Sequence, residues 1–210
     1  MIEFEKVLLL ILGWLFGLLS PAIVDSIRKR REAKEVKIAI WMELQESQYR
    51  LAQTVYFIEM RYGQPNRELV KWIQLTMKEY RGLNSPEDLL NLIESQTSCT
   101  DEEFADIAQA MRATPSRGIS LTKHSMPLLD SKIASLAWLN ATLRNQLLEI
   151  KTRIGFINEE TDNARYFSNL TFQPNIDPEN YQTAQENLIK CYKKYALQAR
   201  IIVDLIMKIK

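Results

Sequence analysis

The chain has very few of the residues from which metal centres are built. It contains one histidine, His124, and two cysteines, Cys99 and Cys191, in 210 residues. Neither cysteine has a cysteine or histidine at metal-ligand spacing, and no His-x-x-x-His or Glu-x-x-His motif occurs. We therefore expect no metal site and no cofactor, and we interpret both cysteines as ordinary helix residues. A metal site made of carboxylates from facing helices has no such spacing and would not be detected in this way.

Phosphate-binding loops, esterase turns and a strong charge of one sign are also missing. The absence of Gly-x-x-x-x-Gly-Lys and Gly-x-Ser-x-Gly argues against the common forms of nucleotide and ester hydrolysis. The formal net charge is +1, so no overall basic field favours nucleic acid as a partner. Alternating strand-like runs are missing too, whereas apolar residues recur at helical spacing. The sequence thus favours an all-α protein that is not an enzyme.

One long apolar run is present near the N-terminus, and cations come directly after it. Residues 7–24 carry no charge, and Arg28, Lys29, Arg30 and Arg31 begin a basic stretch just beyond them. A helix of this length extends about 27 Å at about 1.5 Å per residue, close to the roughly 30 Å of a bilayer's hydrocarbon core. The pattern predicts a transmembrane anchor over residues 1–27, with the four cations at the membrane surface.

Two other interpretations of this run fit less well. A cleaved signal peptide needs a positive leader and small residues at the cleavage site, whereas this leader carries Glu3 and Glu5. A core helix buried on every face needs partners all round, and the other helices of this chain are one-sided. Because cations close to a span stay on the cytoplasmic side, we expect a single-pass protein with its N-terminus outside and residues 28–210 in the cytoplasm.

Residues 28–210 are predicted to form a helical bundle. No glycine or proline interrupts residues 22–62, so the anchor helix is expected to continue as one rod, with Pro21 as its kink and Tyr62-Gly63 as its stop. Heptad spacing runs from Leu129 to Ala164, which predicts a second long helix. Three inward stripes are indicated by the spacing: Ile38, Trp41, Leu44, Leu51, Val55, Ile58 and Tyr62; Leu129 to Ala164; and Leu188, Tyr192, Tyr195, Ala199, Ile202, Ile206 and Ile209.

Short connections between such helices favour an antiparallel arrangement. Asp177 is expected to cap the last helix, with Pro178 at its first position. Residues 66–125 are interpreted as a helical insertion with shorter helices near 67–80, 87–95 and 101–112. Ser85-Pro86 and the capping box Thr100 to Glu103 are the start signals of the last two.

Two features favour self-association. Gly13 and Gly17 form a Gly-x-x-x-Gly pair, which lets two membrane helices approach closely, although chance often produces this spacing. Asn140 occupies a position of the heptad seam that is normally apolar, and a buried amide there fixes register or oligomeric state. An Asn at the wetted edge of the bundle is the equally weighted alternative. We therefore expect a homo-oligomer.

Arg117 and His124 fit the spacing Arg-x(4–6)-His. This pair resembles the motif of HEPN ribonucleases, helical-bundle proteins that typically dimerise so that two Arg and His pairs face one RNA phosphate. That resemblance would make Arg117 and His124 catalytic. The family usually has a polar residue directly after the arginine, whereas this chain has Gly118. A surface histidine beside Lys123 is the alternative interpretation.

The segment from Gly13 to Glu32 and the run Asp162-Asn-Ala-Arg-Tyr-Phe resemble sequences of uncharacterised bacterial single-pass membrane proteins with a helical cytoplasmic domain. The resemblance implies a bacterial inner membrane and carries no activity or site residue. The leading hypothesis is a membrane-anchored, self-associating interaction or scaffold protein with a lipid bilayer and a cytoplasmic protein as partners. The alternative is an HEPN-like membrane effector that cleaves RNA or forms a pore, as in phage defence.

Overall fold

The computed structural model describes residues 2–82, 87–112 and 119–209, and within these ranges every regular element is a helix. The all-α prediction is therefore confirmed. The elements in chain order are α1 (Ile2–Tyr62), α2 (Arg67–Glu79), α3 (Glu87–Ser98), α4 (Asp101–Met111), α5 (Pro127–Ser131), the 3-10 helix η1 (Ile133–Trp138), α6 (Ala141–Thr171) and α7 (Pro178–Lys208).

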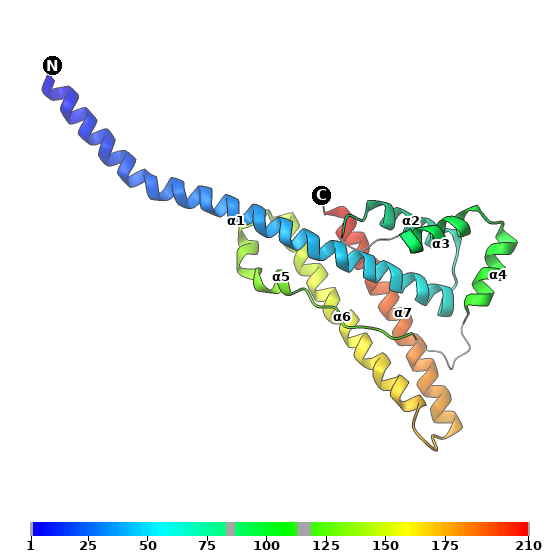
Figure 1. Ribbon diagram of the computed structural model, residues 1–210. Coiled ribbons are helices and arrows are strands. Elements are labelled where there is room, and N and C mark those ends of the chain that lie inside the picture. The colour runs from blue at the N-terminus through cyan, green and yellow to red at the C-terminus, as the bar shows by residue number, and fades with distance from the viewer. Residues whose placement is uncertain (1, 83–86, 113–118, 210) are drawn as a thin grey trace.

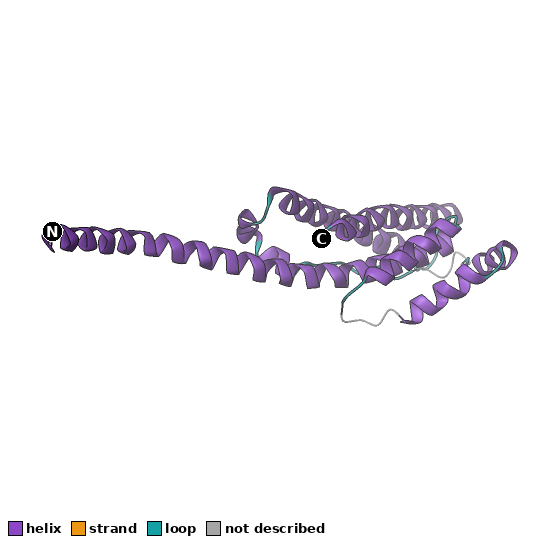
Figure 2. Ribbon diagram, turned by 90° about the horizontal axis from the view of Figure 1, so that it is seen from above, coloured by secondary structure: helices purple, strands orange, loops and turns teal. Residues whose placement is uncertain are grey.

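Helix α1 is a single rod of 61 residues, as the uninterrupted spacing predicted. Its N-terminal half projects away from the rest of the molecule, and its C-terminal half packs against the other helices (Figures 1 and 2). Pro21 lies inside the helix without ending it. Among the side chains of α1 that the structure describes, the first buried one is Val36, which lies more than halfway along the helix. The helix ends at Tyr62, where the predicted stop occurs.

Helices α6 and α7 form an antiparallel hairpin, and the C-terminal half of α1 packs across it (Figure 1). Asp177 caps α7 by accepting a hydrogen bond of 2.9 Å from the Glu179 backbone N–H, with Pro178 at the first helical position, as predicted. The predicted inward stripes of both helices are buried over Leu147, Ile150, Ile154, Ile157, Thr161, Ala164, Leu188, Tyr192, Tyr195, Ala199, Ile202 and Ile206. This seam is the centre of the hydrophobic core.

The predicted heptad helix is wrong before residue 141. The chain forms α5 and η1 there, and Asn140 has extended backbone angles (φ −61°, ψ 153°). Its side chain accepts a hydrogen bond of 2.8 Å from the Leu143 backbone N–H and so caps α6. Asn140 is exposed, so it is not a buried seam amide. The physical reason is local competition, because an Asn that satisfies a free N–H favours starting a helix over continuing one.

The predicted inward face of α1 is wrong at one position. Ile38 is 53% exposed, whereas Val36 and Ile40 are buried. Spacing alone did not distinguish these registers, since Val36, Ile40 and Leu44 also succeed one another at helical intervals. The position of the hairpin decides which stripe is covered.

Helices α2, α3 and α4 lie close to the predicted positions. Thr100 and Glu103 form the predicted capping box at the start of α4. The predicted cap Ser85-Pro86 lies outside the described residues. Contacts join α2 with α3, and α1 contacts both α2 and α4. Helices α2 and α4 therefore pack on α1, and α3 packs on α2.

Candidate functional site

The projecting half of α1 carries a large exposed apolar surface. Its described side chains from residue 4 to residue 31 are all exposed. The most exposed of the large apolar ones are Phe4, Leu9, Leu10, Trp14 and Phe16, at 67% to 76%. Monomeric soluble proteins rarely expose contiguous apolar surface of this extent. This half of the helix is therefore a candidate contact surface for lipid or for protein.

No helix in the described part of the chain is both long enough and apolar enough to cross a bilayer. The predicted single-pass anchor over residues 1–27 is thus unsupported by the described residues. The apolar run of residues 7–24 also contains positions 15, 18–20 and 22, whose side chains lie outside the described set.

The basic stretch at residues 28–31 is exposed and only partly paired. Arg28 and Arg31 form ion pairs with acids one turn later, Glu32 at 2.9 Å and Glu35 at 3.2 Å. Exposed pairs of this kind contribute only about 0.3 to 0.5 kcal/mol and leave the cations accessible. Within the described residues, Lys29 and Arg30 form no ion pair, so the stretch presents positive charge around the helix.

The two glycines of the Gly-x-x-x-Gly pair have no packing role in one copy of the chain. A Cβ atom built on Gly13 or Gly17 meets no described atom within 4 Å. Their predicted role in oligomerisation therefore stays a prediction. Asn140 caps α6 at the surface of one copy, so a buried seam amide no longer supports its predicted role in oligomerisation, and that role also stays a prediction.

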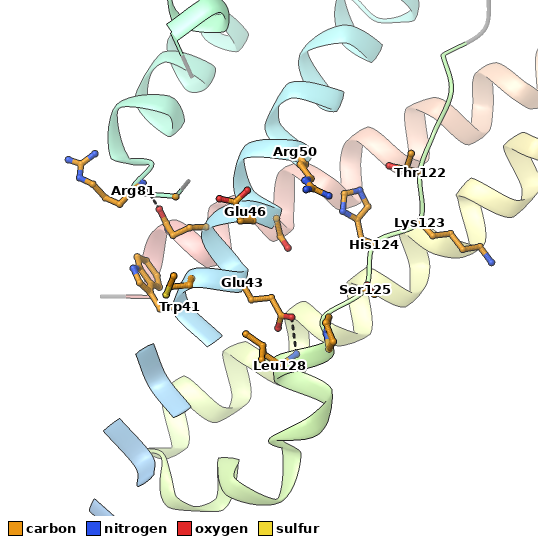
Figure 3. A pocket seen from close by; sticks show the side chains of 15 residues that line it. Trp41, Glu43, Glu46, Arg50, Arg81, Thr122, Lys123, His124, Ser125 and Leu128 are labelled. Carbon is orange, nitrogen blue, oxygen red and sulfur yellow. Dashed lines mark hydrogen bonds between the residues drawn. The ribbon is translucent and has the colours of Figure 1, made fainter. Parts of the chain in front are cut away.

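A cavity of about 420 Å³ opens between α1 and an extended segment, residues 119–126, which we call the strap (Figure 3). The strap connects the short helices to α5 and passes beside the bundle (Figure 1). The walls from α1 include Trp41, Glu43, Glu46 and Arg50, and the opposite walls are Thr122, Lys123, His124, Ser125, Pro127 and Leu128.

Side chains from the bundle hold the strap in place. The Tyr192 hydroxyl donates a hydrogen bond of 2.7 Å to the Ile119 carbonyl. The Asn158 amide both donates to the His124 carbonyl and accepts from the His124 backbone N–H, each at 2.8 Å. The Glu43 carboxylate accepts the first backbone N–H groups of α5, from Leu128 and Leu129, at 2.9 Å each. These bonds satisfy backbone N–H and C=O groups of the strap and of the first turn of α5 that have no partner within a helix.

His124 lies at the centre of this arrangement. Its Nε2 atom lies 2.8 Å from the hydroxyl of Tyr195, which is fully buried on α7. Burial first, and then the charge of Arg50, lower the pKa of His124 to about 4. Burial also raises the pKa of Tyr195 above its ordinary value. Both groups are therefore neutral at pH 7, so His124 is a poor general acid at that pH.

The predicted catalytic pair is not assembled by the described structure. Arg117 and its neighbour Gly118 lie outside the described residues, so no distance joins Arg117 to His124. The cation whose charge lowers the pKa of His124 is Arg50, which lies 74 positions earlier in the chain. Sequence reasoning missed Arg50 because no motif links it to the strap.

The surroundings of Cys191 differ from those of a reactive cysteine. It is buried on α7, and burial together with the neighbouring Glu160 raises the pKa of its thiol to about 11. A thiol with that pKa is protonated at neutral pH and is a poor nucleophile. The interpretation of this cysteine as a structural residue agrees with its surroundings.

No protein-family model, curated protein or solved structure matches this chain.

Proposed function

We propose that the protein is a membrane-anchored helical interaction protein that self-associates and holds its bundle at the membrane surface for a cytoplasmic protein partner. The observation that carries this proposal is the exposed apolar surface on the projecting half of α1. Each large apolar side chain moved out of water contributes about 1.5 to 3 kcal/mol. Five such side chains, Phe4, Leu9, Leu10, Trp14 and Phe16, would together contribute about 7.5 to 15 kcal/mol, which is comparable to the net stability of an ordinary domain, so an apolar environment for this surface is strongly favoured.

The direction of insertion is set by the charges. The cationic stretch Arg28 to Arg31 separates the apolar half of α1 from the bundle. Cations at that position favour a cytoplasmic location for the bundle, and they also attract anionic lipid headgroups. The proposed location is a bacterial inner membrane with the N-terminus outside. A green fluorescent protein fused after Lys210 should then fluoresce, and an alkaline phosphatase fused there should be inactive; the reverse pattern would overturn the orientation.

Membrane insertion is tested by flotation with liposomes and by carbonate extraction of the full-length protein. The variant Leu8→Arg/Leu12→Arg places two cations in the apolar run, at about 2.5 to 3.5 kcal/mol each near a bilayer centre. It should shift the protein to the extractable fraction. The matched control is Ile38→Arg/Met42→Arg, because these residues have the same spacing on the same helix and are 53% exposed. Release of the unmodified protein by carbonate would contradict the anchor.

Self-association is tested by the mass of the protein in mild detergent. We expect a mass above that of one chain, and Gly13→Ile should lower it because a β-branched side chain prevents close helix approach. Gly155→Ile is the control, since a Cβ atom on Gly155 of α6 also meets nothing within 4 Å. A monomeric mass at every concentration, or equal effects of both substitutions, would remove this part of the proposal.

A further inference from the structure

We propose that the cavity between α1 and the strap binds a small organic anion, with its carboxylate or phosphate on Arg50 and its apolar part against Trp41 and Leu128. This inference does not rest on the membrane proposal. It assigns a ligand class to a site in which the sequence motifs singled out His124 alone.

The size and the walls of the cavity fit such a ligand. Its volume of about 420 Å³ lies within the range of roughly 300 to 1,000 Å³ that is typical of small-molecule sites. One part of the wall is apolar, made by Trp41, Met42, Pro127 and Leu128. The indole of Trp41 supplies a large flat surface on which an aromatic or aliphatic group can pack.

Arg50 is the cation of this cavity that remains available. The Lys123 ammonium lies 2.7 Å from the Asp162 carboxylate, and the Arg81 guanidinium donates to the carbonyls of Lys78 and Tyr80. The Arg50 guanidinium, in contrast, forms no hydrogen bond or ion pair with any described residue. Figure 3 shows it beside His124, and both residues line the cavity. A guanidinium binds carboxylate and phosphate through two parallel N–H donors.

The acids of the cavity are already engaged, which favours an anion over a cation. Both oxygen atoms of Glu43 accept backbone N–H groups of α5. Glu46 accepts a hydrogen bond of 2.8 Å from the Tyr80 hydroxyl. These hydrogen bonds fix both carboxylates on groups of the protein and occupy part of their capacity to accept hydrogen bonds from a cationic ligand. The charge of Arg50, which already disfavours protonation of His124, remains available for an anion.

The test uses three fluorinated probes of similar size: 4-fluorobenzoate, 4-fluorophenyl phosphate and 4-fluorobenzylamine. Binding to the full-length protein in mild detergent is measured by ¹⁹F relaxation, and His124 is monitored by NMR as the only histidine of the chain. We expect at least one of the two anions to bind, and the better one identifies carboxylate or phosphate as the preferred head. The amine should not bind. A bound anion beside Arg50 should also raise the pKa of His124.

The variant Arg50→Gln should weaken anion binding at least tenfold, whereas Arg165→Gln should leave it unchanged. Arg165 is an exposed arginine of α6 outside this cavity, so its substitution removes the same charge without changing the site. Any uptake of probes by the detergent then affects both variants equally. Since Arg50 is exposed, its substitution should preserve the fold, which the helical circular dichroism signal checks. Equal binding of the amine, equal affinity in Arg50→Gln, or no response of His124 to either anion would each overturn the proposal.

Discussion

Acidification is expected to remove a contribution to stability that depends on His124. In the unfolded chain the residue takes up a proton near its ordinary pKa of 6.5, whereas in the folded protein its pKa is about 4. The unfolded state therefore binds the proton more tightly over this window. The contribution of the neutral histidine to stability is complete above pH 6.5 and is lost as the pH falls toward 4.

The size of the effect is given by the gap between the two pKa values. At about 1.4 kcal/mol for each pKa unit, the gap between 6.5 and about 4 corresponds to a loss of about 3 kcal/mol. The causes are the burial of the ring against Tyr195 and the charge of Arg50. A loss of this size is a large part of the stability of a typical domain.

The assay is denaturant unfolding of the full-length protein in mild detergent between pH 7.5 and pH 4, for the unmodified chain and for His124→Gln. Glutamine can still form a hydrogen bond with Tyr195 but does not titrate. Carboxylates titrate in both proteins, so they cancel in the difference between the two curves. That difference should shrink by about 1.4 kcal/mol for each pH unit across the window. Parallel curves, or a pKa near 6.5 for His124 by NMR, would refute the reasoning.

Three further predictions concern the fold. Asn158→Ala removes both bonds to the His124 backbone, so it should cost about 1 to 3 kcal/mol and speed protease cleavage within the strap, whereas the exposed Asn163→Ala should do neither. Asn140→Ala should cost about 1 kcal/mol in chemical denaturation without changing the oligomeric mass, and Asn140→Asp should restore the cap. Ile202→Ala, in the centre of the core, should cost about 2 to 5 kcal/mol, while Leu197→Ala, 60% exposed on the same helix, should stay within about 0.5 kcal/mol.

Local signals in the sequence located most of the helices. The missing glycine and proline between residues 22 and 62 implied one rod, and Tyr62-Gly63 marked its end. Asp177-Pro178 and the Thr100 capping box marked the starts of α7 and α4. These signals succeed because a cap or a stop acts through hydrogen bonds within a few residues, independently of the rest of the fold.

The same kind of local chemistry explains the main failure. The heptad spacing from Leu129 onward continued without a break, yet Asn140 caps a new helix instead of continuing one. Leu129 and Leu136, which come before Asn140, are still buried, but they lie in short helices that pack on α1. Periodicity records which residues are apolar and leaves open whether one helix carries them.

The sequence by itself determined the helical class, the long α1 rod and the seam between α6 and α7, because these depend on spacing and on neighbouring residues. Only the tertiary structure decided the candidate site. The strap has no regular pattern of its own, and its path is set by Tyr192, Asn158 and Glu43, which are distant from it in the chain. The neutral state of His124 and the free charge of Arg50 depend on that path, since burial and proximity arise only when these segments pack together.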